Sequence, residues 1–314
     1  MRRGLGWLFA ITALTIALGP WIGVAVPSLD RLAVALPAAP LLAIAALLCR
    51  RTVKLVLIAG AALCVSGVPL VREAWPATVG DEAPAGSARL VVVSHNVADA
   101  NVDPARTSRS LIATDADILL LQEVDGRFRP ELQRLRRRFP FGSDCRKRCS
   151  VAILSRLPMG RVRYRFRDAA NRPVGPPLVQ GVVTIAGRRV TIVSIHLTRG
   201  SDAATRAGQR AALADAVRGV PDPALILGGD FNLVPYQASF RRLGDDLQPL
   251  VRADRGLFTF PARWDTRPVP WPLVDIDHVF AGPAWIVAAA RRLPKTGSDH
   301  YPIRVDLVLR PSAL

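Results

Sequence analysis

The stretch LILGGDFNLVP, residues 225–235, decides how the rest of the chain is interpreted. The apolar run from Ala224 to Leu227 predicts a buried strand, and the two glycines after it allow a sharp turn. Asp230 and Asn232 then follow at the C-terminal end of the strand. Because residues two apart in an extended chain point the same way, both side chains can reach one water molecule or phosphate oxygen. Such a pair can deprotonate and orient a nucleophile, although the motif alone is equally compatible with a strand followed by an Asx turn.

The composition of the chain is both strongly apolar and strongly basic. Its 314 residues are 50% hydrophobic and carry a formal net charge of +17, so apolar and basic residues must be segregated. The part that follows the first apolar stretches is long enough for one large domain with a full core. A basic surplus favours polyanions, phosphate esters or anionic lipids as partners, although a skew towards arginine can also come from codon bias.

Three apolar stretches open the chain: Leu5 to Val26, Leu32 to Cys49 and Val53 to Val71. Each is long enough to cross the core of a bilayer as a helix, so we predict three transmembrane helices. A cleavable signal peptide would explain the first stretch but not the second and third.

The basic residues that flank these stretches predict their orientation. Arg31 and Arg72 fall on one side of the membrane, and a larger group falls on the other: Arg2, Arg3, Arg50, Arg51 and Lys54. Since the more basic flank is cytoplasmic, an odd number of spans places everything after Val71 outside. We therefore expect a multi-pass protein of the cell membrane with an extracytoplasmic domain.

The predicted organisation has three parts. Residues 1–74 form the transmembrane anchor, residues 75–88 (WPATVGDEAPAGSA) form a tether, and residues 89–314 form the catalytic domain. The tether is rich in Pro, Gly and Ala and has no hydrophobic period. In the domain, Cys145 and Cys149 bracket a basic turn, and in an oxidising space we expect a disulfide between them, although the short spacer also allows free thiols.

Strands outnumber helices in the predicted domain. Besides the strand before Asp230, we predict strands at Arg89–Asn96, Asp117–Gln122, Val151–Leu154, Arg161–Phe166, Leu178–Ile185, Arg189–Ile195, Val274–Phe280, Trp285–Ala290 and Ile303–Leu309. Helices are predicted at Pro104–Thr114, in part of Gly126–Phe139 and at Ser201–Arg218, where Ser201 can cap the helix. Consecutive strands favour an α+β fold of antiparallel, packed sheets flanked by helices over a parallel doubly wound sheet.

Side chains capable of chemistry recur where the predicted strands end. They are Asn96, Glu123, His196, Asp230 with Asn232, Asp277, and Asp299 with His300. Each one alone has an ordinary explanation, such as a turn cap, a surface ion pair or a satisfied core histidine. The ordered set instead favours one catalytic site.

The segments around these residues resemble the endonuclease/exonuclease/phosphatase superfamily. In family order they are SHNV, LLLQEVD, VAILSR, VSIHL, GGDFN, DIDHVF and GSDHYPI, and they cover about Arg89 to Arg310. The resemblance implies a four-layer α/β/β/α sandwich, here preceded by the three transmembrane helices. It also implies hydrolysis of a phosphoester with a divalent metal ion, usually Mg²⁺.

The resemblance assigns roles to the residues at the strand ends. Asn96, Glu123 and Asp299 are implied metal ligands, and their hard oxygen donors suit Mg²⁺ or Mn²⁺ and not zinc. Asp230 is implied as the base that takes a proton from the attacking water, and Asn232 as the residue that orients water or phosphate.

The histidines receive different roles. His300, held by Asp277, is expected to donate to a non-bridging phosphate oxygen. His196 is expected either to contact the phosphate or to protonate the leaving oxygen. Tyr164 is, by location alone, a candidate for the tyrosine that some family nucleases place near the phosphate. Two further histidines, His95 and His278, are expected to be structural neighbours.

Three functions remain open at this point. The first is a membrane-anchored phosphoesterase acting on a lipid-linked phosphate or pyrophosphate, because the chain resembles a membrane-bound branch of the superfamily linked to glycopeptide (teicoplanin) resistance and thought to act on polyprenyl phosphates. The second is a nuclease, for which a basic surface would supply phosphate contacts. The third is a degenerate binding module, which the full set of ligand-type residues argues against. The superfamily predicts the reaction better than the substrate.

Overall fold

The structure, a computed structural model, describes residues 2–49, 52–75, 86–145, 149–167, 173–199 and 202–311. Residue contacts divide the chain into two units. The first comprises Met1–Trp75, Ser201–Ala207 and Leu233–Asp245, and the second comprises Pro76–Gly200, Gly208–Asn232 and Asp246–Leu314. Most of the predicted tether, residues 76–85, lies outside the described residues.

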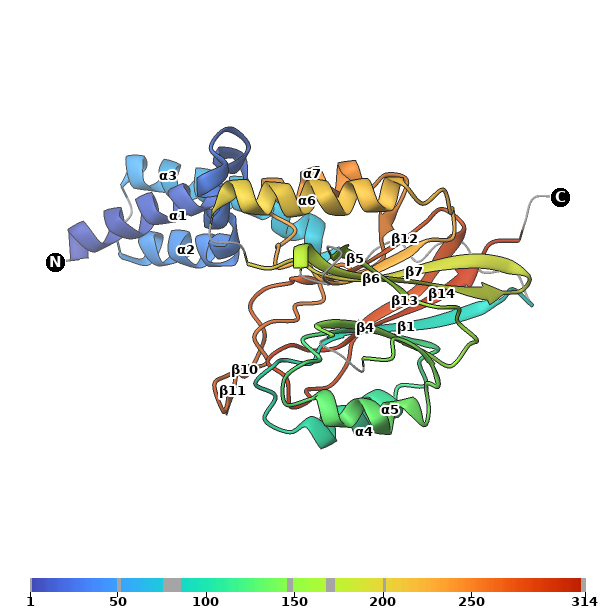
Figure 1. The fold of residues 1–314 in the computed structure, drawn as a ribbon. Helices are drawn as coiled ribbons and strands as arrows, with labels where there is room; N and C mark the ends of the chain where they lie inside the picture. The colour runs from blue at the N-terminus through green and yellow to red at the C-terminus, as the bar shows by residue number, and fades with distance from the viewer. Residues whose placement is uncertain are drawn as a thin grey trace. The chain divides into compact units, whose positions relative to one another are not determined.

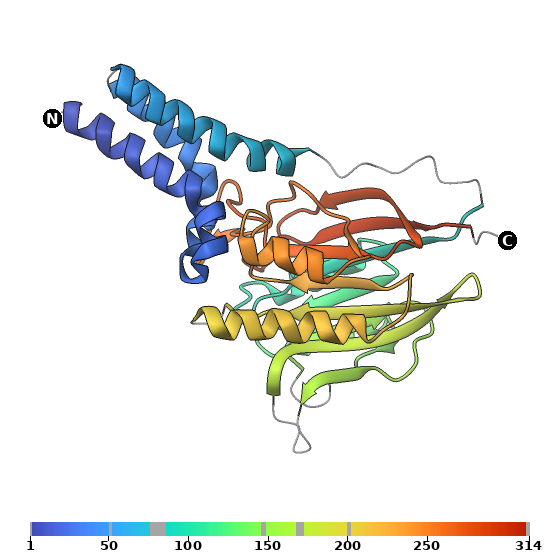
Figure 2. The ribbon, with the colours of Figure 1, turned by 90° about the horizontal axis from the view of Figure 1, so that it is seen from above.

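Apolar helices make up most of the first unit. They are α1 (Arg2–Ala25), the 3-10 helix η1 (Pro27–Ala38) continued by α2 (Ala39–Cys49), and α3 (Val53–Ala74). As predicted, three segments are long and apolar enough to span a membrane, and Figure 2 shows α1 and α3 side by side. The helices α1, α2 and α3 pack together through small residues that allow close backbone approach: Ala13, Ala17, Ala39, Ala43, Ala59 and Ala62.

The second apolar segment differs from the prediction, because only its latter half is an α-helix. Pro37 lies inside the 3-10 helix, where its missing amide hydrogen interrupts the α-helical bonding pattern. The 11 residues of α2 alone would extend only about 16 Å, so crossing a hydrocarbon core of about 30 Å requires η1 as well. Within the same unit, the η1 carboxylate of Asp30 accepts hydrogen bonds from the backbone of Ala238 (2.7 Å) and Ser239 (3.2 Å). These residues begin α7 (Ala238–Asp246), a helix that the sequence analysis did not predict.

Two six-stranded sheets form the second unit (Figure 1). The first has the order β13-β14-β1-β2-β4-β3, with β13 Trp285–Arg292, β14 Ile303–Leu309, β1 Arg89–Asn96, β2 Ile118–Gln122, β4 Val151–Ser155 and β3 Phe141–Gly142. The second has the order β5-β6-β7-β8-β12-β9, with β5 Arg163–Arg167, β6 Pro173–Ile185, β7 Arg188–His196, β8 Ile226–Asp230, β12 Asp277–Ala281 and β9 Val251–Arg252. A separate ribbon pairs β10 (Arg263–Trp264) with β11 (Arg267–Pro268).

The sheets are mixed and not purely antiparallel. Each contains one parallel pair, β1 with β2 and β7 with β8, and the other pairs are antiparallel. Each parallel pair is connected through a helix, α4 (Pro104–Ile112) in the first sheet and α6 (Ala203–Arg218) in the second. Parallel neighbours need such a crossover, and the arrangement brings the carboxyl ends of both strands of each pair to the same sheet edge.

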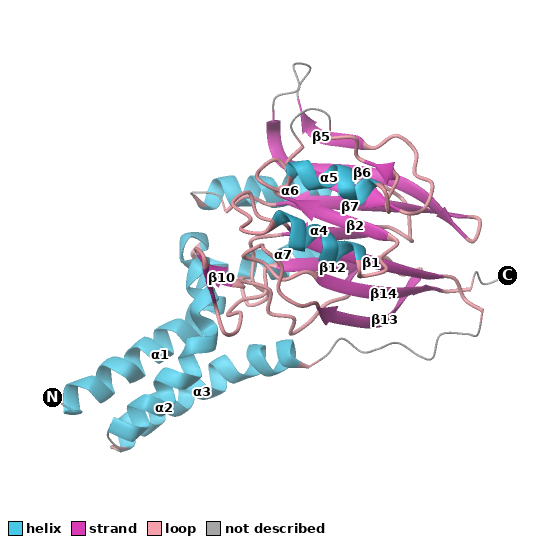
Figure 3. Ribbon diagram, turned by 90° about the horizontal axis from the view of Figure 1, so that it is seen from below, coloured by secondary structure: helices cyan, strands magenta, loops and turns pink. Residues whose placement is uncertain are grey.

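Apolar side chains pack on both faces of the first sheet. Between the two sheets lies a core to which both contribute, for example Val92, Leu120, Ile192 and Ile226. A second cluster, including Val93 and Leu121, lies on the outer face, where Figure 3 shows α4 and α5 (Leu132–Arg136) on the side of the sheet that faces the viewer. With α6 on the outer side of the second sheet, this gives the predicted α/β/β/α sandwich (Figure 1).

Candidate active site

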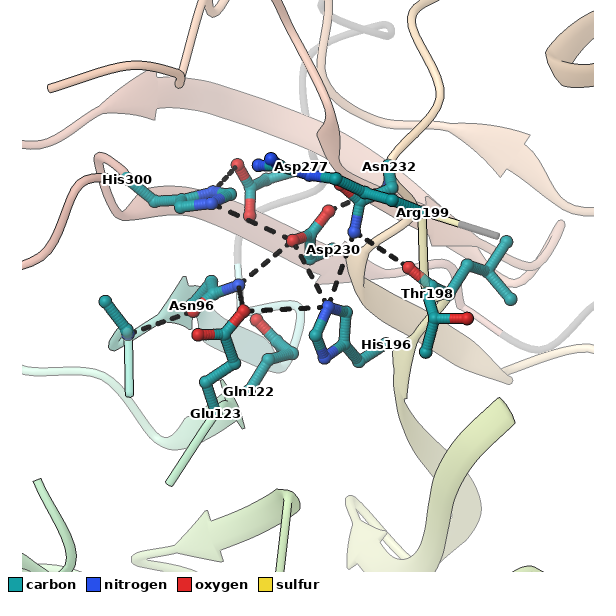
Figure 4. A network of polar contacts seen from close by, with 12 residues as sticks. Asn96, Gln122, Glu123, His196, Thr198, Arg199, Asp230, Asn232, Asp277 and His300 are labelled. Carbon is teal, nitrogen blue, oxygen red and sulfur yellow. Dashed lines mark hydrogen bonds and ion pairs between the residues drawn. The ribbon is translucent and has the colours of Figure 1, made fainter. Parts of the chain in front are cut away.

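The strand register gathers the predicted catalytic residues. Asn96 pairs with Gln122 at the end of β1 and β2, and His196 pairs with Asp230 at the end of β7 and β8. Asp277 pairs with Asp230 from the antiparallel side. The ends of several strands therefore meet at one place, as Figure 4 shows.

Asp230 is a buried carboxylate at the centre of this group. Its Oδ1 accepts a hydrogen bond from Asn232 N at 2.8 Å, and its Oδ2 accepts one from Asn96 Nδ2 at 3.0 Å. The Nε2 atoms of His196 and His300 lie 3.6 and 3.8 Å from the same Oδ2. Burial raises the pKa of Asp230, although the neighbouring His300 opposes this effect. A carboxylate with a raised pKa is suited to accept a proton near neutral pH.

The glycine before Asp230 permits the close pairing of β7 and β8. Gly229 has a φ of +153°, and a Cβ placed on it would lie 1.9 Å from the carbonyl oxygen of Ile195. Since Ile195 directly precedes His196, the missing side chain lets the two catalytic strand ends approach each other.

Glu123 is held towards the site by an unusual backbone conformation and by two hydrogen bonds. Its φ is +57°, a value that few non-glycine residues adopt. One carboxylate oxygen accepts from Asn96 Nδ2 and the other from Asp99 N, both at 2.9 Å. Burial alone would raise the pKa of Glu123, but these hydrogen bonds and the nearby histidines outweigh it and lower the pKa. The carboxylate is therefore ionised at neutral pH.

Asp277 and His300 form a buried ion pair. His300 Nδ1 lies 2.8 Å from Asp277 Oδ2, which also accepts a hydrogen bond from Thr259 Oγ1 at 2.6 Å. Burial alone would lower the pKa of His300, but Asp277 outweighs it and raises the pKa to about 10. Burial likewise opposes ionisation of Asp277, yet His300 lowers its pKa. The ring of His300 is therefore a cation whose Nε2 faces Asp230.

Asn232 and His196 lie on the other side of Asp230. Asn232 also has a positive φ, +50°. Its Nδ2 donates to Leu197 O at 2.8 Å and lies 3.4 Å from His196 Nε2. The Nε2 of His196 lies 3.8 Å from Glu123 Oε1 as well as close to Asp230. The sequence analysis had identified no carboxylate near His196, and the structure supplies these two.

Most of the predicted site residues therefore lie together, namely Asn96, Glu123, His196, Asp230, Asn232, Asp277 and His300. Asp299 is the exception. Its half-buried carboxylate contributes to the raised pKa of the adjacent His300, but the clusters of acidic and histidine groups found among the described residues do not include it. Tyr164 lies elsewhere, with its hydroxyl 3.3 Å from Cys149 Sγ.

Sequence reasoning missed Thr259 and Arg199. Thr259 supports Asp277 from a Pro- and Arg-rich segment without a recognisable motif, and Arg199 Nε donates to Asn232 Oδ1 at 2.9 Å. Arg199 lies only three residues after His196. That proximity to a predicted site residue was the one signal available.

The donors in the site suit a hard divalent cation. Glu123, His196 and Asp230 offer ligand atoms that all lie within 4.8 Å of one another. The ionised Glu123 is the best-placed oxygen donor, whereas Asn96 turns Nδ2 and not Oδ1 towards the carboxylates. The Asn96 Oδ1 accepts a hydrogen bond from Ala98 N at 2.9 Å, so metal coordination by that oxygen would have to replace this bond. A bound Mg²⁺ would stabilise charge on the phosphoryl oxygens.

A second buried cluster lies on the other face of β12. His278 Nδ1 lies 2.8 Å from Asp254 Oδ2 and 3.9 Å from Asp275 Oδ1, and the His278 ring packs 5.7 Å from that of Phe231. Burial would lower the pKa of His278, but Asp275 and Asp254 outweigh it and raise the pKa. His95 is also fully buried, but burial lowers its pKa to about 3, so it stays neutral beside Thr296. Both histidines are thus part of the interior, as expected.

Acidic and histidine side chains at the edge of two packed mixed sheets define a hydrolase with a sandwich fold. Residues 93–300 match the Endonuclease/Exonuclease/phosphatase family, and the chain belongs to that family. Its members are metal-dependent phosphoester hydrolases, and this chain is therefore an enzyme of that class. No curated protein sequence matches the chain.

Solved structures share the fold at low sequence identity. Sphingomyelinase C from Streptomyces griseocarneus is 19% identical, with 69% of this chain and 99% of that chain covered and a TM-score of 0.53. TDP2 from D. rerio, complexed with a single-strand DNA product, is 19% identical, with 70% and 98% covered and a TM-score of 0.57. A beta toxin variant from Staphylococcus aureus with bound magnesium ions is 16% identical, with 71% and 99% covered and a TM-score of 0.51.

Proposed function

We propose that this chain is a membrane-anchored phosphoesterase that hydrolyses a lipid-linked phosphate ester or pyrophosphate at the extracytoplasmic face of the membrane, using Mg²⁺ or Mn²⁺. The observation that carries the reaction is the contact of buried Asp230 with His196, His300 and Asn232 beside an ionised Glu123. The observation that favours a lipid is the presence of three membrane-length apolar segments in the same chain.

In this proposal each residue acts at a stated atom. Asp230 Oδ2 takes the proton of the attacking water, and Asn232 orients that water or the phosphate. His300, cationic because of Asp277, donates from Nε2 to a non-bridging phosphate oxygen. His196 Nε2 contacts the phosphate or protonates the leaving oxygen. Glu123, with Asn96 and Asp299 as further proposed ligands, holds the divalent metal ion, which when bound polarises the phosphoryl group.

Two features support an extracytoplasmic, membrane-facing site. Cys145 and Cys149 are bonded, and disulfides persist in oxidising spaces. The segment from Arg127 to Arg138 also carries several exposed arginines, which would be attracted to anionic headgroups by roughly 1 kcal/mol each near the surface. The same arginines would suit nucleic acid, and the relatives include both kinds of protein, a sphingomyelinase and one complexed with DNA.

The experiment uses the full-length protein in liposomes with Mg²⁺. It receives polyprenyl pyrophosphate, a phosphodiester lipid and duplex DNA, and released phosphate, released headgroup and cleaved DNA are measured. We expect hydrolysis of one of the two lipids. DNA cleavage without hydrolysis of either lipid would support the nuclease alternative, and no Mg²⁺-dependent turnover at all would favour the binding module.

A matched pair of variants tests the headgroup contact. Arg127→Gln with Arg137→Gln should reduce lipid hydrolysis in anionic liposomes but not in neutral ones. Arg163→Gln with Arg165→Gln removes the same charge from exposed positions on β5 and should have a smaller effect. Equal losses from the two pairs would mean that only net charge matters.

A further inference from the structure

Arg199 and Phe260 extend the site beyond the residues that act on the scissile phosphate. Arg199 is exposed, and its Nε donates to Asn232 Oδ1 at 2.9 Å. Its guanidinium carbon lies 5.2 Å from the centre of the Phe260 ring, and that ring lies 4.9 Å from the His300 ring. Figure 4 shows the Arg199 side chain passing Asn232. The Phe260 ring thus lies in contact with both the His300 ring and the Arg199 guanidinium.

These contacts hold the guanidinium in place before any ligand arrives. One N–H group bonds Asn232 and one face of the planar group lies over an aromatic ring, so the long side chain has less conformational freedom to lose on binding. A guanidinium carries five N–H groups arranged as a fork that matches two phosphate oxygens. Since Arg199 is exposed, an anion from solvent or from a substrate can reach it.

The position of Arg199 next to Asn232 indicates which part of a substrate its guanidinium would bind. Asn232 connects the two places directly, because its Oδ1 bonds Arg199 while its Nδ2 lies 3.4 Å from His196 Nε2. His196 in turn faces Asp230 Oδ2 at 3.6 Å. A phosphate that contacts His196 and Asn232 therefore has Arg199 as the next cation, on the other side of the Asn232 amide, and a second phosphate joined to the first would extend towards it.

We infer that Arg199, supported by Phe260, binds a second phosphate attached to the scissile one, so that the site selects a pyrophosphate over a single phosphate ester. This inference rests on the proposed function, because it names which of the lipid-linked phosphates the site prefers. In a role limited to positioning Asn232, Arg199 would affect every substrate alike, and the two roles are therefore separable.

Ligand binding tests the inference without depending on turnover. The full-length protein in detergent micelles with Mg²⁺ is titrated by calorimetry with imidodiphosphate, a diphosphate analogue with a non-hydrolysed bridge, and with inorganic phosphate. We expect the wild type to bind imidodiphosphate more tightly. Arg199→Ala should weaken imidodiphosphate binding by about tenfold or more while changing phosphate binding by less than about twofold.

Two further variants complete the design. Arg199→Lys keeps the charge but lacks the fork, and should recover only part of the lost affinity. Arg163→Ala, at an exposed arginine on β5, should leave the preference unchanged. An equal loss for both ligands in Arg199→Ala, or a wild type without any preference for imidodiphosphate, would overturn the inference.

The outcome for the proposed function is read separately. It fails if the wild type hydrolyses no lipid phosphate in liposomes, whatever the calorimetry gives. The inference fails if lipid pyrophosphate and lipid monophosphate lose the same fraction of kcat/KM in Arg199→Ala, even when lipid hydrolysis itself is established.

Discussion

The Asp230 carboxylate is affected by its burial, by two nearby histidines and by hydrogen bonds from neighbouring residues. Burial raises its pKa while the adjacent His300 opposes the rise, and hydrogen bonds from Asn96 and Asn232 hold the carboxylate in place. Glu123 differs because its hydrogen bonds lower its pKa. Two carboxylates in one site are thereby separated into a proton acceptor and a permanent anion.

The first prediction follows from this separation. Asp230→Asn removes the proton acceptor and Glu123→Gln removes the anion, so each should lower kcat by two or more orders of magnitude, roughly, with the fold retained. The measurement is Mg²⁺-dependent phosphate release together with the circular dichroism of each variant. Asp215→Asn, the same chemical change at an exposed position of α6, should stay near the wild-type rate. Near-normal turnover in either site variant would refute the assignment.

A second prediction concerns the pH dependence of stability. Asp275 and Asp254 raise the pKa of His278 above its usual 6.5 despite burial. A histidine whose pKa is raised on folding stabilises the fold fully below its unfolded pKa, and this contribution is lost as pH rises through the folded pKa. The free energy of unfolding should therefore fall as pH rises above about 6.5, by on the order of 1 kcal/mol per unit of pKa shift.

Asp254→Asn provides the comparison for this effect. The neutral amide in that variant cannot stabilise the imidazolium, so the fall should be smaller and end at a lower pH. Since His300 also has a raised pKa, about 10, and is retained in both proteins, the difference between their denaturation curves isolates His278. Parallel curves between pH 6 and 9, roughly, would show that this cluster does not titrate as described.

At this scale the sequence predicted the residues at strand ends, including the Asp277 that holds His300, but not Thr259 and Arg199, which support the site from outside the strands. Asp230 and His196 stand at the ends of apolar runs, and this local pattern identifies them in the sequence. Thr259 and Arg199 reach the site from irregular segments through tertiary contacts. No local pattern encodes such contacts, so only the folded chain identifies them.

The strand β8 shows how one element couples packing to chemistry. Its Gly229 lets the backbone of β7 approach, because any Cβ there would lie 1.9 Å from Ile195 O. Backbone atoms cannot yield as a flexible side chain can, so the strands would have to separate. The catalytic pair His196 and Asp230 would then separate with them, since they are register partners.

The third prediction is that Gly229→Ala destabilises the fold by about 3 kcal/mol and lowers kcat in the fraction that still folds. Gly208→Ala is the matched control, because a Cβ at Gly208 meets nothing within 4 Å and the residue lies inside α6. Alanine there should stabilise the helix by roughly 0.5–1 kcal/mol. Chemical denaturation of both variants gives the measurement, and equal stability of the two would contradict the explanation.

Elements with a simple pattern were predicted closely, and those shaped by tertiary context were not. The final strand, Ile303–Leu309, has the predicted limits, and β2 differs from its prediction by one residue. In contrast, β6 begins at Pro173 and not at the predicted Leu178, because β5 supplies a pairing partner there. The helices that connect β1 to β2 and β7 to β8 were predicted, but the parallel pairing that such connections imply was not inferred.

Across the whole molecule, the anchor was predicted from length and hydropathy, since crossing a bilayer imposes both. The break within the second segment was not predicted. Pro37 and Pro40 had been assigned to a continuous helix, whereas the chain forms a 3-10 helix up to Ala38 and an α-helix after it. The sidedness of the segments remains a prediction from flanking charge.

The fourth prediction tests that sidedness. Arginines and lysine flanking the first and third segments place Thr52 in the cytoplasm and Gly80, which lies outside the described residues, on the other side. A cysteine at each position is tested in a parent variant with Cys49→Ser and Cys64→Ser, because these two thiols are free whereas Cys145 and Cys149 are bonded. Gly80→Cys should react with an impermeant thiol reagent in intact cells, and Thr52→Cys should react only after the membrane is opened. The unsubstituted parent should stay unlabelled, which reports that the disulfide is intact. Labelling of Thr52→Cys in intact cells, with Gly80→Cys protected, would invert the topology and place the site in the cytoplasm, where a lipid phosphate of the outer face is out of reach.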